Sequence, residues 1–296
     1  MEEEGKGEAI LERTIIFTIA RMNPPTPGHL LLIKTLITEA IDRDVNEVFI
    51  ILSKTMNNID NPISCPQKIN ILGNADNTSK TMINSLKTKM ISDQPDNAQK
   101  IRNVIVHVIC VPESNTNKRK RDDEENLKTR ASTPFSVLGE IIGPDSDIPN
   151  TNLLFIVGDD RADFLVNIKK YYSKMKKMKS IEGKTLAREG MKDLKEVSEN
   201  CERLNEFDMS NENALSASFV RNIVKCGNFD KFRELYLPYI DEERITHLYK
   251  QIQEGLNLTT QTTKSGGKKT KRMSKQINKR NKRTKRRNKS KNTKKR

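Results

Sequence analysis

Apolar positions along the first 255 residues follow two alternating patterns. Short, nearly continuous runs of aliphatic and β-branched residues are typical of strands buried on both faces, and apolar residues recurring every three or four positions are typical of amphipathic helices. The expected strands span residues 14–20, 46–53, 103–111 and 152–158. The expected helices span residues 27–42, 66–75, 78–91, 134–142, 160–173, 228–236 and 241–254.

This alternation predicts an α/β fold, a Rossmann-like, doubly wound parallel sheet with helices on both faces and a helical closure at its C-terminal end. The domain is expected over residues 13–255, after an acidic N-terminal extension of residues 1–12. Two stretches depart from the pattern and are expected to be insertions. Residues 112–133 are highly charged, and residues 174–210 are rich in Lys and Glu, with partial helical periodicity at Leu186, Met191, Leu194 and Val197.

The net charge of +15 comes from one end of the chain. Residues 264–296 contain 18 Lys and Arg and no acidic residue, which leaves 36 basic against 39 acidic residues elsewhere. Such a segment has too few apolar residues to form a core, so residues 256–296 are expected to be a disordered basic tail. A tail of this kind binds nucleic acid or other polyanions without sequence selectivity, and it can equally act as a localisation signal.

Cysteine and histidine usage bears on metal sites and compartment. Cys65, Cys110, Cys201 and Cys226 show no C-x-x-C spacing, and the chain has three histidines, so no zinc cluster is expected. Unpaired cysteines would suit a reducing, intracellular compartment, with the cytoplasm favoured and the nucleus possible. No apolar run reaches membrane-spanning length, and the acidic start is unlike a signal peptide.

A short motif after the first expected strand is the strongest indication of chemistry. Asn-Pro-Pro-Thr-Pro-Gly-His occupies residues 23–29 and leads directly into an amphipathic helix. Pro27 suits the first helical turn, and Gly28 leaves no side chain above it. The free N–H groups and positive dipole of this helix end, with Thr26 and His29 beside it, favour phosphate binding. The alternative is an ordinary Pro-Gly helix start with a packed histidine.

Two later segments are expected to reach the same place. The fourth strand ends at Gly158 and is followed by Asp160 and Arg161, and ligands of open parallel sheets bind at the carboxyl ends of strands. With Asp159 and Asp163, these acids could also be a metal cluster or a solvated helix start. In Leu-Ser-Ala-Ser-Phe-Val-Arg, residues 215–221, Ser218 is expected to cap a helix whose first turn carries Arg221, which can hold phosphate bidentately.

In this order and spacing, these motifs resemble the signatures of the (H/T)xGH nucleotidyltransferase superfamily, including phage and large-DNA-virus members. Residues 23–29 match the signature with Thr26 and His29 at its polar positions, and residues 215–221 match the pattern I-S-S/A-T-x-I-R. The resemblance implies transfer of a nucleotidyl group from a nucleoside triphosphate to a phosphate monoester, with Mg²⁺ accompanying the triphosphate. Ala20 and Met22 stand where many relatives have Gly and Phe, so substrate placement can differ.

The resemblance also implies roles for individual residues. Thr26, His29 and Arg221 are the expected catalytic residues. The expected nucleotide- and phosphate-binding residues are Asn23, Pro24, Gly28, Gly158, Asp160, Ser216 and Ser218. Secondary candidates, which would neutralise acceptor or leaving-group charge, are Arg21, Lys54, Lys68 and Arg161. No protein-held metal is expected.

The substrates remain open at this point. The position of Arg221 after the serines favours an adenylyltransferase that uses ATP and nicotinamide mononucleotide to make NAD. A cytidylyltransferase that uses CTP and an alcohol phosphate is the second interpretation. A third, of another class, is an inactive homologue that acts as a nucleic-acid-binding or virion-associated protein through its basic tail.

Overall fold

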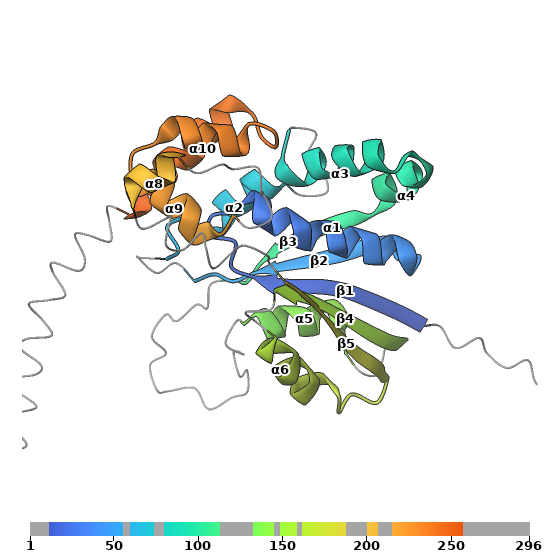
Figure 1. Ribbon diagram of the computed structural model, residues 1–296. Coiled ribbons are helices and arrows are strands. Elements are labelled where there is room, and N and C mark those ends of the chain that lie inside the picture. The colour runs from blue at the N-terminus through green and yellow to red at the C-terminus, as the bar shows by residue number, and fades with distance from the viewer. Residues whose placement is uncertain are drawn as a thin grey trace, which may run out of the picture.

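A five-stranded parallel sheet forms the centre of the molecule (Figure 1). The computed structural model describes residues 12–55, 60–73, 80–112, 133–144, 149–158, 162–187, 200–206 and 215–256. The strands are β1 (Glu12–Ala20), β2 (Glu47–Leu52), β3 (Ile105–Cys110), β4 (Asn150–Gly158) and β5 (Met178–Leu186), in the spatial order β3-β2-β1-β4-β5. The order reverses between β1 and β4, and a crevice is expected at the carboxyl ends of these two strands.

Helices cover both faces of the sheet. On one face lie α1 (Pro27–Asp42), α2 (Cys65–Leu72), α3 (Met82–Asp93) and α4 (Ala98–Asn103), the last preceded by a 3₁₀ turn at Pro95–Asn97. On the other lie α5 (Pro134–Ile142) and α6 (Asp163–Tyr172). The C-terminal helices gather beyond α2: α8 (Cys201–Glu206), α9 (Ala217–Lys225), α10 (Phe229–Tyr236) and a last helix over residues 242–256. The α/β prediction and the helical closure are therefore confirmed.

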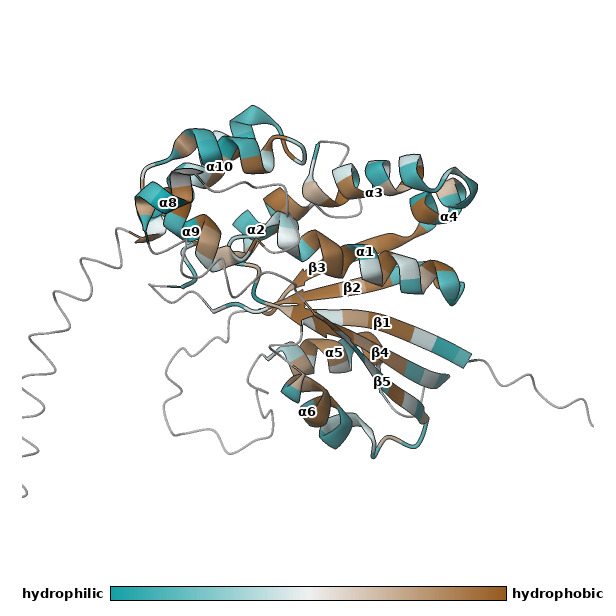
Figure 2. Ribbon diagram, in the orientation of Figure 1, coloured by the Kyte–Doolittle hydropathy of each residue, from teal (hydrophilic) through white to brown (hydrophobic). Residues whose placement is uncertain are grey.

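Alternation along each strand divides the apolar core in two. Ile16 and Ala20 of β1 pack on the side of α1 and the C-terminal helices, whereas Ile15, Phe17 and Ile19 pack on the side of α5 and α6. The strands at the centre of the sheet are accordingly apolar, and polar residues lie on the outer faces of the helices (Figure 2). This double burial explains why β1, β2 and β4 can be recognised as continuous apolar runs.

The fifth strand corrects one prediction. Residues 178–186 were assigned to an insertion with helical periodicity, but they pair in parallel with β4 from Thr151↔Met178 to Gly158↔Leu186. β5 lies at the edge of the described sheet, and its nine residues are exposed or half-buried. A half-exposed edge strand tolerates Lys and Glu, so its composition hides it.

The expectation that the four cysteines are unpaired is also wrong. Cys65 is bridged to Cys110, and Cys201 to Cys226, with Cα–Cα distances of 5.9 and 5.6 Å. Both pairs are far apart in sequence, by 45 and 25 residues, so the fold rather than local spacing brings them together. Cysteine usage therefore does not support a reducing compartment.

Several other expectations fall on residues that the structure leaves undescribed. These are the acidic extension up to residue 11, most of the charged stretch 112–133, much of the stretch 187–214, and the basic tail from residue 257. In the described ranges, no helix combines the length and apolar character needed to cross a membrane.

Candidate functional site

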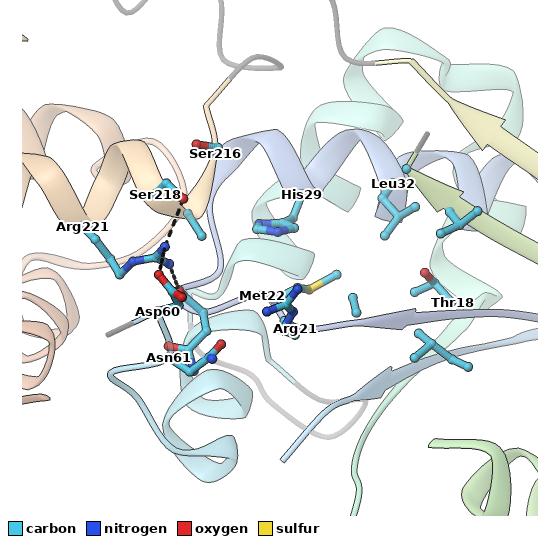
Figure 3. Close-up of a pocket in the computed structure, with 16 residues that line it drawn as sticks. Thr18, Arg21, Met22, His29, Leu32, Asp60, Asn61, Ser216, Ser218 and Arg221 are labelled. Carbon is cyan, nitrogen blue, oxygen red and sulfur yellow. Dashed lines mark hydrogen bonds and ion pairs between the residues drawn. The ribbon is translucent and has the colours of Figure 1, made fainter. Parts of the chain in front are cut away.

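A cavity of about 350 Å³ opens at the carboxyl ends of β1 and β4, where the strand order reverses (Figure 3). It is walled by the end of β1 and the following loop, the first turns of α1, a short segment before α2, the end of β4 and the start of α9. The lining residues are Thr18, Ile19, Ala20, Arg21, Met22, Asn23, His29, Leu32, Asp60, Asn61, Val157, Gly158, Ser216, Ala217, Ser218 and Arg221. The cavity therefore lies where the sheet topology predicts a ligand.

At the start of α1, His29 is fixed by the residue that precedes the helix. The backbone N–H of Thr26 donates to His29 Nδ1 over 3.0 Å, and Thr26 Oγ1 lies 2.8 Å from the same nitrogen. Because Nδ1 accepts the backbone hydrogen bond, the hydrogen-bond pattern assigns the proton of the neutral ring to Nε2. A donor on Nε2 suits a phosphate oxygen in the cavity that His29 lines.

The loop between β1 and α1 is held by hydrogen bonds to residues from distant parts of the chain. Asn23 Nδ2 donates to the carbonyl of Ile63 over 2.8 Å, and Asn23 Oδ1 accepts from the N–H of Ile63 over 3.0 Å. The hydroxyl of Thr26 donates to the carbonyl of Leu215 over 2.8 Å. Tyr236 Oη donates to the carbonyl of Pro25 over 2.6 Å, and the Asn23–Pro24 peptide is cis. Buried contacts of this kind fix the loop before any ligand arrives.

Arg221 joins this loop to α9. Its Nη1 donates to the carbonyl of Asn23 over 2.7 Å, and its Nη2 donates to Ser218 Oγ over 3.0 Å and lies 3.5 Å from the carboxylate of Asp60. Arg221 is 7% exposed, and burial lowers the pKa of its guanidinium, although Asp60 opposes that effect. Among the described residues, Arg221 forms its ion pair with the exposed carboxylate of Asp60, and a buried cation that faces a cavity in this way is suited to bind a further anion.

The start of α9 differs from the sequence prediction. Ser216, not Ser218, is the N-cap, and its hydroxyl accepts from the N–H of Phe219 over 3.2 Å. The helix begins two residues earlier than expected, which places Ser218 in the first turn, where its hydroxyl accepts a hydrogen bond from Arg221. Both serines line the cavity, so the predicted site still includes them.

Of the secondary cationic candidates, some line the cavity and others do not. Arg21 lines the cavity and is exposed. Lys68 is 1% exposed, does not line the cavity, and donates from Nζ to the carbonyl of Ser53 over 3.2 Å. Burial, with a smaller effect of Arg21, lowers the pKa of Lys68 to about 8. Lys54 donates to the carbonyl of Pro112 over 3.3 Å and is not part of the cavity wall.

The remaining predicted site residues also differ in whether they line the cavity. Gly158 lines the cavity, and Pro24 and Gly28 lie in the loop and first turn beside it without lining it. Asp160 and Arg161 lie outside the described residues. The described ranges contain no group of three or more His, Cys, Asp or Glu side chains that could hold a metal ion.

Sequence reasoning missed several lining residues. Asp60 and Asn61 lie between β2 and α2 in the sequence, and no local pattern links them to a helix about 160 residues later. Thr18 lies inside an apolar strand and Leu32 inside an amphipathic helix, and neither was singled out as a site residue. A polar residue at an inward position of a buried strand was the one signal available for Thr18.

The fold and this cavity define an open parallel α/β protein with a cation-bearing crevice at its topological switch point. No model of a known protein family matches the chain, and a search of curated proteins finds no significant match.

Proposed function

We propose that this chain is a nucleotidyltransferase that transfers a nucleotidyl group from a nucleoside triphosphate to a phosphate monoester and releases pyrophosphate. One observation carries the proposal. Thr26, His29 and Arg221 come from two motifs about 190 residues apart, and hydrogen bonds join the two motifs around one cavity. A pair of unrelated helix starts would not need a histidine, two serines and an arginine to face the same space.

The cavity wall supports binding of a polyphosphate. The N-termini of α1 and α9 both meet the cavity, and each supplies the positive end of a helix dipole. Arg21 and Arg221 add two guanidinium groups, against the carboxylate of Asp60. We assign His29 and the start of α1 to the α- and β-phosphates, and Ser216, Ser218 and Arg221 to the β- and γ-phosphates. Thr26 is fully buried and does not line the cavity, so we assign it to positioning His29.

The proposed reaction is one displacement at phosphorus. An oxygen of the acceptor phosphate attacks the α-phosphorus, a new P–O bond forms, and the bond to the β-phosphate oxygen breaks with its electron pair leaving on pyrophosphate. The protein positions the two substrates and neutralises the charge that develops on the bridging oxygen. Donation from His29 Nε2 and Arg221 serves this purpose, and no covalent enzyme intermediate is required.

Mg²⁺ is proposed to enter with the triphosphate, which supplies most of its oxygen ligands. Asp60 is the one carboxylate among the described residues that line the cavity, and its side chain is 60% exposed. It can add a ligand to such an ion, whose positive charge would assist departure of pyrophosphate.

For the substrates, we favour ATP with nicotinamide mononucleotide, giving NAD, and keep CTP with an alcohol phosphate as the alternative. The deciding feature is the position of Arg221, which follows the serines of the second motif instead of preceding them. Asp160, which the family resemblance places near the nucleotide, lies outside the described residues.

The test measures pyrophosphate release by the purified full chain with Mg²⁺. Each of ATP and CTP is paired with nicotinamide mononucleotide, phosphopantetheine, phosphocholine and glycerol 3-phosphate. Release with one pair, lost in His29→Ala but retained in the exposed-site control His247→Ala, would support the proposal and identify the substrates. Absence of release with every pair, together with absence of nucleotide binding by calorimetry, would refute it.

A second candidate function, binding of nucleic acid, is favoured by one observation in the folded part of the chain. The end of α6, the connection that follows it and the start of β5 carry six exposed lysines and no acidic residue between positions 169 and 179. Tyr171 lies among them with 64% of its surface exposed and stacks on Phe135 at a centroid distance of 5.3 Å. Lysines with an exposed aromatic ring are suited to a single-stranded phosphate backbone and its bases.

Binding of a fluorescent single-stranded oligonucleotide across a salt series tests this second function. Replacing Lys169, Lys170 and Lys174 by Glu is expected to weaken binding and to reduce the salt slope by about 0.7 for each phosphate that the variant no longer neutralises. An unchanged slope would show that this surface does not bind nucleic acid.

A further inference from the structure

One polar group in the crevice has no partner within the described protein. Thr18 is 0% exposed and lines the cavity, and its hydroxyl oxygen makes no hydrogen bond with any described group. Buried hydroxyls in native proteins are normally hydrogen-bonded, because an unpaired one forfeits its interaction with water. An unpaired hydroxyl in a cavity wall is therefore best explained by a partner that the ligand supplies.

Thr18 lies at the opposite end of the cavity from the buried cation. Figure 3 shows Thr18 and Leu32 at one end, Arg221, Ser218 and Asp60 at the other, and His29 between them. The end that contains Arg221 is suited to phosphate, as argued above. Figure 3 labels Thr18 and Leu32 at this end and draws Arg21 below His29, between the two ends. The two residues labelled at the Thr18 end are uncharged, so this end is suited to an uncharged part of the substrate.

Near Thr18, the cavity is lined by residues of both the sheet and α1. Thr18 and Ala20 lie on the face of β1 that packs towards α1, and Leu32 of α1 lines the same cavity. By alternation with Ile156, Gly158 lies on the same face of β4, where the absence of a side chain leaves room above the sheet. A space above the sheet with an apolar wall and one hydroxyl is suited to a planar ring that has a hydrogen-bonding edge.

We infer that Thr18 is a specificity-determining residue, whose hydroxyl hydrogen-bonds the polar edge of a planar heterocycle bound between β1, β4 and α1. This inference rests on the proposed function, in which the phosphates occupy the other end of the cavity. The heterocycle is either the base of the nucleoside triphosphate or a ring of the phosphate-monoester acceptor, and the experiment below separates these two sources.

The test uses the full chain and the variants Thr18→Val and Thr18→Ser, with binding measured by calorimetry. The probes are ATP, CTP and inorganic tripolyphosphate, which has the phosphates but no ring. Thr18→Val is expected to weaken binding of the substrate that carries the ring about tenfold, because the polar edge of the ring loses its hydrogen-bond partner. Thr18→Ser keeps the hydroxyl and is expected to stay within about threefold of the wild type, and tripolyphosphate is expected to bind all three proteins equally.

A matched control comes from the neighbouring strand. Thr151 of β4 is also 0% exposed, but its hydroxyl donates to the carbonyl of Pro149 over 2.8 Å and it does not line the cavity. Thr151→Val is expected to lower the melting temperature without changing nucleotide affinity, whereas Thr18→Val is expected to leave the melting temperature of the free protein equal or higher. A purely structural role for Thr18 would reverse that second expectation.

The source of the ring follows from the affected substrate. Weaker binding of ATP or CTP identifies the base, and a raised KM for nicotinamide mononucleotide with unchanged nucleotide binding identifies the acceptor. Wild-type behaviour of Thr18→Val with every substrate would overturn the inference while tripolyphosphate binding still supported the phosphate site. Absence of tripolyphosphate binding to the wild type would instead refute the proposed function itself.

Discussion

Replacing Lys68 by Met is expected to stabilise the protein at neutral pH. The side chain is 1% exposed, and burial beside Arg21 lowers its pKa from an ordinary value of 10.5 to about 8. Each pKa unit corresponds to about 1.4 kcal/mol, so keeping this lysine charged in the folded protein at pH 7 costs about 3 kcal/mol. The substitution also removes the hydrogen bond to Ser53, which costs about 1 kcal/mol of stability. The net effect expected is therefore a free energy of unfolding that is higher by about 2 kcal/mol.

The sign of the pH dependence follows from the same pKa. Between about pH 8 and 10.5 the unfolded chain holds a proton on Lys68 that the folded protein has released, so the free energy of unfolding of the wild type rises with pH across this window. Lys68→Met lacks this rise. Its advantage at pH 7 is therefore expected to shrink above pH 8, and to vanish or reverse near pH 10.

Urea denaturation of both proteins at pH 7, 8, 9 and 10 measures this difference directly, because all other titrating groups cancel between them. Lys89→Met, on the exposed side of α3, serves as the control and is expected to change the free energy of unfolding by less than about 0.5 kcal/mol. If Lys68→Met is less stable than the wild type at pH 7, and by the same amount at pH 10, the reasoning about a buried charge is wrong.

Three further predictions concern the loop and the start of α1. His29→Ala is expected to lower turnover at least about 100-fold with an unchanged circular dichroism spectrum, and wild-type rates would refute the proposed mechanism. Tyr236→Phe removes the donor to the carbonyl of Pro25 and is expected to lower the free energy of unfolding, measured with urea, by about 1–2 kcal/mol. The control Tyr249→Phe, whose ring packs against Phe229 and Phe232, is expected to lower it by less than about 0.5 kcal/mol. Equal effects of the two substitutions would contradict this prediction. Asn23→Ala breaks both hydrogen bonds to Ile63 and is expected to cost about 2–3 kcal/mol and to raise the KM for the triphosphate; an unchanged KM would show that the loop is not set by this contact.

The sequence was sufficient to predict those features that depend on the residues of one short segment alone. Buried strands appear as apolar runs, and Asn23 to His29 combine a turn, a helix start and polar side chains within seven residues. The position of Arg221 beside the cavity could be predicted for the same reason, since the serines that accompany it lie at the N-cap and in the first turn of α9. Local chemistry of this kind does not depend on the rest of the fold.

The rest depends on contacts across the chain. Asp60 lies beside Arg221 only because the segment before α2 and the start of α9 both line the cavity at the carboxyl ends of β1 and β4. The two disulfides join segments that no spacing rule connects, and β5 is a strand because β4 offers it a partner, not because of its own composition. The unpaired hydroxyl of Thr18 is a property of its surroundings, so it has no counterpart in the sequence.

The bracing of the loop at residues 23–26 also sets an order of assembly. Its partners are Ile63, Leu215, Arg221 and Tyr236, three of which lie in the last third of the chain. A nascent chain that has emerged only as far as β5 can pair all five strands, yet it lacks three of the four residues that hold this loop. The proposed triphosphate site would then form only after α10 has docked, so a product truncated before Tyr236 would keep the sheet and lack the complete loop.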